Sequence, residues 1–581
     1  MDGITNGFSV GINPQKIYNE DLISGETRYI PLNNVQKDSI SEWVLKGVKK
    51  GYISGPYDLN HQFSFGGERS RLFLAPLFVV PKPNNKWRTI VHLSFRLRPY
   101  MYTINELLFT YMKTVQYVRF KEVVRLVKNA GKGAWLFLVD AQDAYYRVPI
   151  QPSDWRYMGF KWEKKYWVFR SLQMGLSSSP RIYTAFADAV EYVCVNENRD
   201  ISFLNGIQQL RHYIDDFFGA LPQKKNADRL FHALYKVFEK LGIPTKWEKC
   251  TSPAQRAKIL GWIYDTILQM VLLPDKKRDT IVSMITSLLA SRKGNKKLLQ
   301  QLIGRLQHAS QVIFPGKAFV RRLEALLYLP QFGDKETFPI NNFVAEDLRW
   351  WLNILTSSTL CGMSFDLLLK HPSEADIVVY TDACTEIGGG GFVICDHRVI
   401  YFQIKWSRTN KQATERFRKL DITVLELLMS VAAVKSVQHL VHNTAISIYN
   451  DNPGAAGALR SKAPPLGRLD LQALIRELAT FAFHQKFYWW GIHETVKDSE
   501  NMRIADKLSR FIPVKWDQAA VQVDITKECN ELFDVLWEAP RNLPHKKDIS
   551  TSLRQAYGLL LDLDQPVIQT APERTEHNIL S

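Results

Sequence analysis

The chain has 581 residues, of which 46% are hydrophobic and 23% are charged, and 75 Lys+Arg against 58 Asp+Glu give a formal net charge of +17. This composition is ordinary for a globular protein and excludes wholesale disorder and a collagen-like repeat. The basic excess favours a polyanionic partner, such as nucleic acid or an acidic membrane surface. At roughly 150 residues per domain, the length suggests about four domains.

Cysteine usage and hydropathy exclude further classes of protein. The six cysteines form no Cys-x-x-Cys pair and no Cys/His cluster, which disfavours a disulfide scaffold or a structural zinc and favours a reducing compartment. The longest apolar stretch, Leu72–Val80, is far shorter than the roughly 18–20 residues of a transmembrane helix. The N-terminus has neither the basic region nor the apolar core of a secretory signal. We therefore expect a soluble intracellular protein that is not secreted and has no membrane partner.

The predicted elements begin with an amphipathic helix over 39–48. From 73 to about 262, apolar β-type runs alternate with helical patterns, which is typical of an α/β or α+β body. Ser179-Pro180 predicts the start of one of these helices, with a hydroxyl cap and a proline in the first turn.

Further along the chain, apolar residues at helical spacing predict two amphipathic helices, around 281–288 and 299–306. A basic turn, 292–297, joins them, and such a turn is usually a solvated face rather than a nucleic-acid contact. A second α/β segment runs from 376 to about 510, and a last helix is predicted over 550–561.

Acidic residues follow two apolar runs in the first α/β body. Trp135–Val139 predicts a buried strand that ends at Asp140. Asp215 and Asp216 lie between apolar flanks, and because neighbouring strand residues point to opposite faces, this pair predicts a hairpin turn. Each feature alone is typical of a cap or a solvated loop. Together they suggest carboxylates that meet at strand ends and hold divalent cations through oxygen, as Mg²⁺ prefers.

A second acidic set lies in the later α/β segment. Asp382 and Asp451 each follow an apolar run with strand character, and Asp506 lies further on. Glu426 is the only charge in a helix that is apolar on nearly every face, and a buried carboxylate without a partner costs several kcal/mol or so, so it needs a cation or a proton. The run Gly388–Gly391 is not a phosphate loop, and tight strand packing or a bulge explains it more simply.

Six motifs in chain order resemble those of the reverse transcriptases, over most of 72–323. They are Val80–Val91, Val139–Pro149, Leu172–Pro180, Tyr213–Asp216, Gly242–Cys250 and Leu260–Trp262. The resemblance implies that Asp140, Asp215 and Asp216 are catalytic and bind metal. It also implies a set of nucleotide-binding residues: Lys82, Arg88, Tyr145, Gln173, Gly175 and Lys249. Among these, Tyr145 would form an aromatic wall beneath the ribose; the alternative is a core aromatic like Tyr146.

Two departures from the retroviral pattern stand out. Gln173-Met174-Gly175 replaces the Pro-Gln-Gly of the retroviral enzymes, which leaves open the side chain that contacts the base or sugar. His92 stands where an acidic residue is usual, and His92-Leu93-Ser94 looks like the DIRS-like retrotransposons, which integrate with a tyrosine recombinase.

The second acidic set resembles the RNase H domain that is fused to reverse transcriptases of LTR-type and DIRS-like elements, over roughly 376–511. The resemblance implies that Asp382, Glu426, Asp451 and Asp506 are catalytic and hold two Mg²⁺ ions. His493 is either the mobile histidine of some relatives or a loop histidine, and its spacing to the following motif favours the loop histidine.

The predicted fold is multidomain α+β: a right-hand polymerase (fingers, palm and thumb) followed by an RNase H-like α/β domain. The predicted domains are 1–61, an N-terminal extension; 62–265, fingers and palm; 266–370, a helical thumb and connection; 371–511, the RNase H-like domain; and 512–581, a tail of unknown role.

The predicted function is an RNA-directed DNA polymerase with RNase H activity that copies retroelement RNA by two-metal nucleotidyl transfer. Two Mg²⁺ ions are expected in each active site, with Mn²⁺ as a possible substitute. The predicted partners are an RNA template, a DNA primer, the RNA–DNA hybrid and dNTPs, and integration is expected from another protein. Two alternatives stay open: a domesticated or inactive copy that only binds nucleic acid, and a relative without RNase H. The intact carboxylates argue against an inactive copy. The second acidic set argues against a relative without RNase H.

Overall fold

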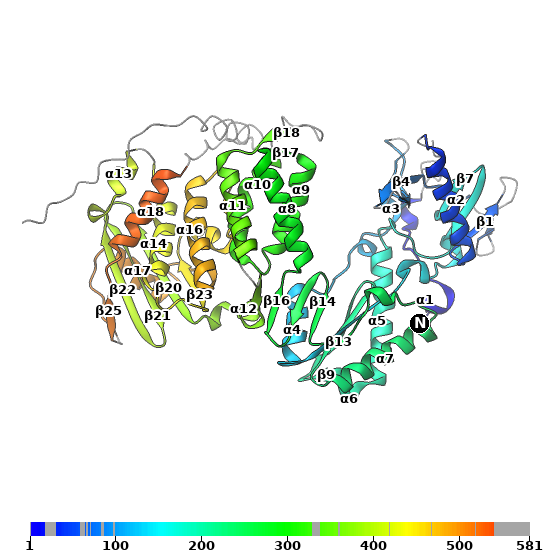
Figure 1. The fold of residues 1–581 in the computed structure, drawn as a ribbon, viewed down its shortest axis with the longest axis horizontal. Helices are drawn as coiled ribbons and strands as arrows, with labels where there is room; N and C mark the ends of the chain where they lie inside the picture. The colour runs from blue at the N-terminus through cyan, green and yellow to red at the C-terminus, as the bar shows by residue number, and fades with distance from the viewer. Residues whose placement is uncertain are drawn as a thin grey trace, which may run out of the picture. The chain divides into compact units, whose positions relative to one another are not determined.

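The computed structural model divides the chain into two compact units, Met1–Gln269 and Met270–Ser581, and each is described by itself (Figure 1). No helix among the described residues is long and apolar enough to cross a membrane. All six cysteines are free thiols. The predicted helix over 550–561 lies outside the described residues. The structure describes residues 2–17, 31–57, 64–65, 68–69, 71–82, 86–96, 99–327, 337–357, 361–416, 419–465, 467–516 and 519–539.

The first long helix of the first unit extends beyond the 39–48 predicted from the sequence. α2 (Asn34–Lys49) begins early because Asn33 and Gln36 form a capping box that satisfies the first backbone N–H groups. It contacts β1 (Ile53–Tyr57), which pairs with β8 (Lys165–Phe169), and β8 pairs with β7 (Gly159–Trp162). Residues 34–57 of the predicted N-terminal extension are thus part of the folded unit.

A four-stranded antiparallel sheet forms the centre of this unit. Its order is β11 (Leu210–Tyr213), β12 (Asp216–Leu221), β6 (Trp135–Asp140) and β13 (Thr251–Ala254). α5 (Ser179–Glu197) and α7 (Lys224–Lys240) pack against the sheet and against each other. α5 begins where Ser179-Pro180 predicted, but Ser179 does not cap it: its hydroxyl donates to the carbonyl oxygen of Gln173 at 2.9 Å. A separate antiparallel ribbon is made by β4 (Leu77–Lys82) and β5 (Lys86–Val91).

Helices dominate the start of the second unit: α8 (Asp275–Ser291), α9 (Lys296–Ala309), α10 (Arg321–Leu327) and α11 (Asn342–Ser357). The two predicted amphipathic helices are confirmed in α8 and α9, whose apolar stripes are buried. The turn predicted between them is instead a short strand, β17 (Lys293–Asn295), because β18 (Thr337–Pro339) pairs with it. That partner lies some forty residues further on, so local sequence could not reveal it.

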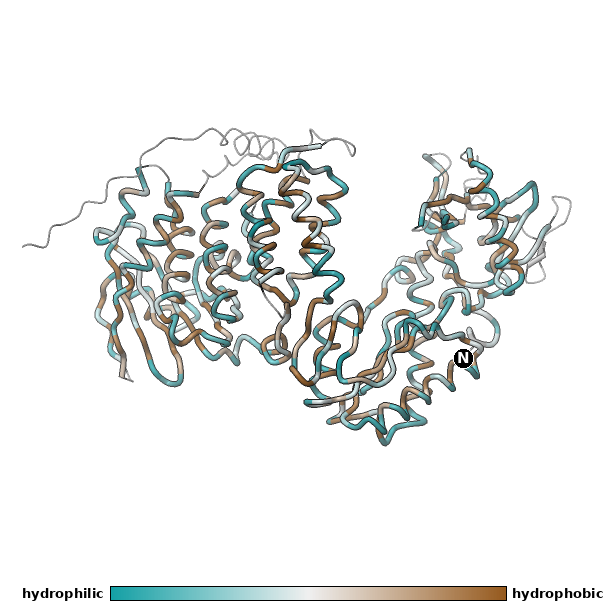
Figure 2. Tube along the Cα trace, in the orientation of Figure 1, coloured by the Kyte–Doolittle hydropathy of each residue, from teal (hydrophilic) through white to brown (hydrophobic). Residues whose placement is uncertain are grey.

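A six-stranded mixed sheet forms the rest of the second unit, with the order β24-β23-β20-β21-β22-β25. β20 (Ile377–Cys384), β21 (Gly388–Cys395) and β22 (Arg398–Lys405) are antiparallel neighbours, whereas β23 (Ala445–Asn450) runs parallel to β20 and β24 (Tyr488–His493) runs parallel to β23. The α/β character predicted for 376 to about 510 is thus present. Figure 2 shows that these strands and the helices beside them contain long hydrophobic segments.

Helices pack on this sheet. α14 (Ile422–Ser436) and α17 (Glu500–Ser509) contact β20 and β21, α15 (Pro453–Ser461) contacts β24, and α16 (Leu469–Gln485) contacts α14. The sheet extends past the boundary predicted at 511: β25 (Ala520–Gln522) pairs with β22, and α18 (Thr526–Glu538) packs on α14 and α16. Part of the predicted tail therefore belongs to this body.

The remaining short strands are β2 (Ser64–Phe65), β3 (Glu68–Arg69), β9 (Phe203–Leu204), β10 (Ile207–Gln208), β14 (Arg256–Ile259), β15 (Trp262–Asp265), β16 (Met270–Leu272) and β19 (Gly362–Ser364). The remaining helices are α1 (Asp2–Asn6), η1 (Pro14–Lys16), α3 (Ile104–Leu107), η3 (Thr110–Lys113), α4 (Phe120–Asn129), η4 (Ala144–Arg147), η5 (Pro152–Tyr157), α6 (Arg199–Ser202), η6 (Trp247–Lys249), η7 (Phe314–Phe319), α12 (Phe365–Leu369), η8 (Pro372–Glu374), η9 (Trp406–Arg408) and α13 (Lys411–Glu415).

Candidate active sites

Three carboxylates meet at one end of the sheet in the first unit. Asp140 ends β6, and its cross-strand partner is Asp216, the first residue of β12. Asp215 lies in the hairpin turn between β11 and β12, where Ile214 has a φ of +54°. The backbone N–H of Ala141 donates to the carbonyl oxygen of Asp215 at 2.9 Å, which holds the turn against the end of β6. The strand and the hairpin turn predicted from the sequence are both present.

Burial makes this acidic cluster electrostatically costly. It raises the pKa of Asp216 to about 6, with the Asp215 and Asp140 carboxylates adding to the effect. It also raises the pKa of Asp215, although a backbone hydrogen bond and the Lys249 ammonium oppose this. Lys249 Nζ donates to Asp140 Oδ2 at 2.7 Å, and this hydrogen bond raises the pKa of the lysine. The cluster therefore holds more negative charge than its surroundings favour, and a cation stabilises it.

The β4–β5 ribbon carries cations on one face. Val80 pairs with Arg88 and Lys82 pairs with Lys86, and directly opposed residues share a face of an antiparallel pair. Because side chains two apart in a strand also share a face, Lys82, Lys86 and Arg88 all lie on one side. The structure brings together Lys82 and Arg88, two of the predicted nucleotide-binding residues, and adds Lys86, which sequence reasoning missed. The signal was present, since Lys86 lies two positions before Arg88, the spacing that places both side chains on one face of a strand.

Tyr145 and Tyr146 occupy different surroundings on η4. The ring of Tyr145 meets Tyr183 edge-on with 5.6 Å between centroids, and burial raises its pKa to about 12, with Asp215 among the nearby groups. The ring of Tyr146 stacks on Tyr52 at 4.6 Å. Tyr145 therefore lies near the acidic cluster, whereas Tyr146 packs against Tyr52.

The segment 172–175 differs from its expected arrangement. Gln173 is only 1% exposed, and its amide N–H donates to Met158 Sδ at 3.2 Å, so its side chain is not available to a nucleotide in this structure. Met174 is 48% exposed and contacts Arg88, the predicted phosphate ligand. Gly175 has a φ of +98°, which favours glycine, and its carbonyl oxygen accepts from Asn105 at 2.8 Å. The exposed side chain of this segment is thus Met174 rather than Gln173.

The second acidic cluster lies at the six-stranded sheet. Asp382 in β20, Glu426 in α14 and Asp451 directly after β23 each place one carboxylate oxygen within 4.8 Å of the others. They form the one group of three or more such ligands found in the described part of the chain. Asp506 in α17 lies outside this group, and its Oδ1 accepts from Arg510 Nε at 2.7 Å. Its charge nevertheless raises the pKa of Asp451, after the larger effect of burial.

Within the described part of the chain, Glu426 is held by neutral donors alone. Its carboxylate accepts from the Ala383 N–H at 2.9 Å and from Asn450 Nδ2 at 3.0 Å. Burial first, and then the Asp382 and Asp451 charges, raise its pKa well above the ordinary value. Burial and the neighbouring acids likewise raise the pKa of Asp382 to about 7, even though the Ser509 hydroxyl donates to it. The sequence-based expectation that Glu426 needs a cation or a proton agrees with this environment.

The glycine run lets two helices approach this cluster. A Cβ on Gly389 would lie 2.3 Å from Met429 Sδ in α14, and a Cβ on Gly390 would lie 2.5 Å from the carbonyl carbon of Leu508 in α17. Neighbouring strand residues point to opposite faces, so the two helices, which carry Glu426 and Asp506, pack on opposite faces of β21. The prediction of tight strand packing is confirmed.

His493 lies beside the second cluster. It ends β24 opposite Asn450, and its Nε2 is 2.9 Å from the carbonyl oxygen of Asp451. The spacing that favoured a loop histidine did not reveal this neighbour, because the parallel pairing of β23 with β24 sets it.

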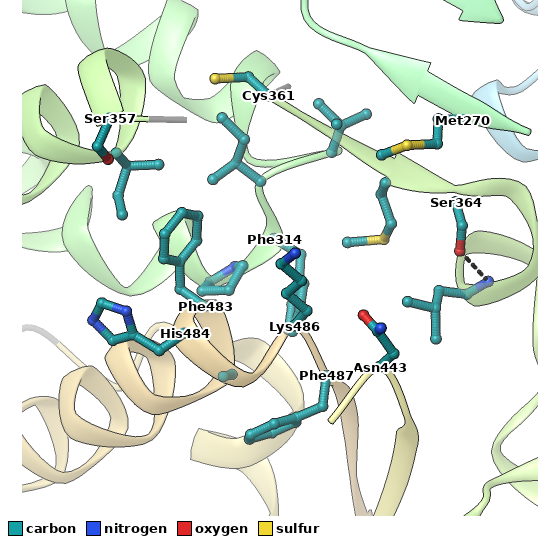
Figure 3. A pocket seen from close by; sticks show the side chains of 18 residues that line it. Met270, Phe314, Ser357, Cys361, Ser364, Asn443, Phe483, His484, Lys486 and Phe487 are labelled. Carbon is teal, nitrogen blue, oxygen red and sulfur yellow. Dashed lines mark hydrogen bonds between the residues drawn. The ribbon is translucent and has the colours of Figure 1, made fainter. Parts of the chain in front are cut away.

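A cavity of about 640 Å³ also lies in the second unit (Figure 3). It is lined by Phe314, Phe483 and Phe487, with Lys486 among them. None of the predicted site residues lines it.

Comparisons with known proteins find similarity over the part of the chain that contains the first acidic cluster. Residues 80–264 match the family model for reverse transcriptase (RNA-dependent DNA polymerase). The chain is 23% identical over 253 residues to the Pro-Pol polyprotein of feline foamy virus, covering 44% of this chain and 19% of the relative. It is 22% identical over 169 residues to Protein P of heron hepatitis B virus, covering 29% of this chain and 20% of that relative. A further match is the Gag-Pro-Pol polyprotein of mouse mammary tumor virus, 22% identical over 217 residues and covering 36% and 11%.

The chain thus spans a fifth or less of the length of these curated relatives. Among solved structures, the foamy viral protease-reverse transcriptase in complex with dsDNA has a TM-score of 0.45 and 17% identity, covering 80% of this chain and 84% of that one. The same protein in complex with RNA/DNA hybrid has a TM-score of 0.37 and 14% identity, covering 84% and 78%. Residues 80–264 therefore resemble a reverse transcriptase domain, and the two units make a multidomain α+β chain.

Proposed function

We propose that this chain is an RNA-directed DNA polymerase that also cleaves the RNA strand of an RNA–DNA hybrid. The observation that carries the proposal is the convergence of Asp140, Asp215 and Asp216 at one sheet end, inside the part of the chain that matches the reverse transcriptase model. The second cluster, Asp382, Glu426 and Asp451, supports the nuclease activity.

Both carboxylate sets suit a hard divalent cation, because ionised carboxylates offer oxygen ligands. Burial also raises the pKa of five of these acids, and a bound cation would oppose that shift: Asp215, Asp216, Asp382, Glu426 and Asp451. Asp140, Asp215 and Asp216 would hold the ions of the first site; Asp382, Glu426, Asp451 and Asp506 would hold those of the second. Asp140 can keep Lys249 and still bind metal, since a carboxylate has about four lone-pair positions. Bound Mg²⁺, or Mn²⁺ in its place, would supply charge neutralisation and a lowered hydroxyl or water pKa.

In the polymerase reaction, the protein's own residues position the nucleotide. Lys82, Lys86 and Arg88 share a face of the β4–β5 ribbon and would bind the triphosphate of a dNTP through charge-assisted hydrogen bonds. Tyr145 would lie under the sugar, and Lys249 would keep Asp140 in place. In the nuclease reaction, Asn450 and the Ala383 N–H hold the Glu426 carboxylate, and Ser509 holds Asp382, so the acids are oriented before substrate binds.

The same proposal names the partners: an RNA template, a DNA primer, the hybrid and dNTPs, within the cell. The motif His92-Leu93-Ser94 supports a DIRS-like retrotransposon as the source, with integration supplied by another protein.

Primer extension on an RNA template with Mg²⁺, run beside an assay of RNA loss from a labelled hybrid, tests the proposal. We expect DNA synthesis from dNTPs and RNA cleavage by the same preparation. Tight hybrid binding with neither reaction, in Mg²⁺ or Mn²⁺, would contradict the proposal and favour the inactive nucleic-acid-binding copy.

A further inference from the structure

An exposed aromatic platform lies at η3 in the first unit. It is formed by Tyr111 on η3, Phe109 directly before it and Arg181 on α5. Tyr111 is 57% exposed, and its ring stacks on Phe109 with 5.3 Å between centroids and 25° between planes. The guanidinium carbon of Arg181 lies 5.8 Å from the centre of the Tyr111 ring. An exposed ring with a cation beside it offers a flat face for stacking together with a positive charge for phosphate.

The platform is held in place before any ligand arrives. Arg181 donates through Nη1 to the carbonyl oxygen of Thr114 at 3.0 Å, and the Thr114 hydroxyl donates to the carbonyl oxygen of Tyr111 at 3.0 Å. The backbone N–H of Phe109 donates to the carbonyl oxygen of Gly11 at 2.9 Å. The backbone that carries the two rings and the Arg181 guanidinium are therefore held before binding, which lowers the ordering cost of binding.

The surroundings of the platform are basic. Lys113 follows Tyr111 on η3, and Lys16 is close enough to lower the pKa of Lys113, after the larger effect of burial. The nearby acid Glu106 is paired with Arg96 and accepts from the Thr103 N–H at 2.9 Å. Glu106 also acts on Lys113, but it is shared with Arg96 and offsets only part of the positive charge of Lys16, Lys113 and Arg181.

The same segment leads to the acidic cluster. Tyr117 lies six residues after Tyr111, and its ring is 4.9 Å from Tyr213, which belongs to the catalytic hairpin. Six residues span at most about 20 Å. Arg181 also precedes, by two positions on α5, the Tyr183 that contacts Tyr145. A strand bound at the platform would therefore lie only a few nucleotides from the site of synthesis.

We propose that Tyr111, Phe109 and Arg181 bind the unpaired template strand next to the site of synthesis, with a base stacked on Tyr111 and a phosphate on Arg181. This inference rests on the proposed polymerase function and adds a place for the single strand. An unpaired strand is the occupant because only unpaired bases expose a face to a ring; in a duplex these faces are already stacked. The lysines and Arg181 then contact the backbone without regard to sequence.

The test compares two primer–templates with the same duplex, one with a template overhang of a single nucleotide and one with a long overhang. We expect the wild-type chain to bind the long overhang more tightly, and Tyr111→Ala to lose about tenfold in affinity for the long overhang alone. Tyr111→Phe should keep the affinity, and Arg181→Gln should weaken binding and flatten its salt dependence.

Tyr192→Ala is the matched control, because Tyr192 is 70% exposed on α5 of the same unit. Tyr111→Leu, which keeps a large apolar side chain without a flat ring, replaces the alanine variant if that one fails to fold. An unchanged preference for the long overhang in folded Tyr111 variants, or an equal loss on both substrates, would overturn the platform. An inactive wild-type chain that still distinguishes the overhangs would refute the polymerase proposal and leave the platform standing.

Discussion

Tyr145 and Tyr146 are neighbours in sequence whose rings face different parts of the first unit. Tyr145 packs edge-on against Tyr183 near the acidic cluster, and Tyr146 stacks between Tyr52 and Phe169. Metal and phosphate contacts treat ribonucleotides and deoxyribonucleotides alike, so discrimination has to come from the 2′ position. A 2′-hydroxyl pressed against a rigid ring is an overpacking problem of about 1–3 kcal/mol.

We therefore expect Tyr145→Ala to raise the use of GTP relative to dGTP by roughly ten- to a hundredfold, the rate equivalent of that energy. Tyr146→Ala should instead lower the free energy of unfolding by about 3 kcal/mol, because it removes a stacked core ring. Single-nucleotide incorporation and urea unfolding of both variants measure these effects. An unchanged GTP/dGTP ratio in a folded Tyr145→Ala enzyme would remove the sugar gate from this residue.

Asp347 illustrates a buried charge with a structural role. Its side chain on α11 is fully buried, 2.8 Å from Arg476 Nη2 on α16 and 3.7 Å from Arg322 Nη1 on α10. Asp347→Ala leaves two arginines without this partner, and we expect a loss of about 3–5 kcal/mol in the free energy of unfolding. The neighbouring Glu346, whose side chain is 52% exposed, is the control, and Glu346→Ala should cost less than about 1 kcal/mol. Similar losses in both variants, measured by thermal or urea unfolding, would argue against a special role for the buried cluster.

At the level of elements, the position of α17 depends on one glycine of β21. A Cβ at Gly390 would lie 2.5 Å from backbone atoms of α17, so this helix would have to move, and Asp506 would move with it. Gly390→Ala should destabilise the chain by about 1–3 kcal/mol and lower RNA cleavage while leaving primer extension intact. Gly457 on α15 offers the control, because nothing lies within 4 Å of a Cβ there, and Gly457→Ala should stabilise by up to about 1 kcal/mol. Full nuclease activity in Gly390→Ala would show that the packing of α17 does not set the site.

The basic residues of the segment between α8 and α9 differ in their surroundings. Arg292 donates to the Ile340 carbonyl oxygen at 3.3 Å and to Asn342 Oδ1 at 3.2 Å, so it fixes the fold, whereas Lys293 and Lys297 are exposed. If the two lysines meet phosphates, neutralising both should reduce the slope of log K against log salt by up to about 2 for hybrid binding. An unchanged slope would place the duplex elsewhere.

For the whole molecule, the sequence predicted local features well and long-range ones poorly. The strand ending at Asp140 and the turn at Asp215 could be predicted because apolar runs flanked by acids are local signals. The ion pair between Lys249 and Asp140 could not be predicted, because the two residues are 109 positions apart and the sheet brings them together. α18 was missed although Cys529, Leu532, Phe533 and Leu536 follow helical spacing, because these four apolar residues are scattered through a polar segment.

The two acidic clusters lie in different compact units, Met1–Gln269 and Met270–Ser581, so the two proposed activities should be separable. This separation is tested most directly by measuring RNA-templated primer extension and hybrid RNA cleavage in Asp215→Asn and Asp382→Asn, each compared with the wild-type chain. Asparagine keeps the shape of each side chain but removes the charge that a cation needs. We predict that Asp215→Asn abolishes extension and leaves cleavage largely intact, and that Asp382→Asn does the reverse. Loss of both activities in either folded variant would contradict two independent active sites.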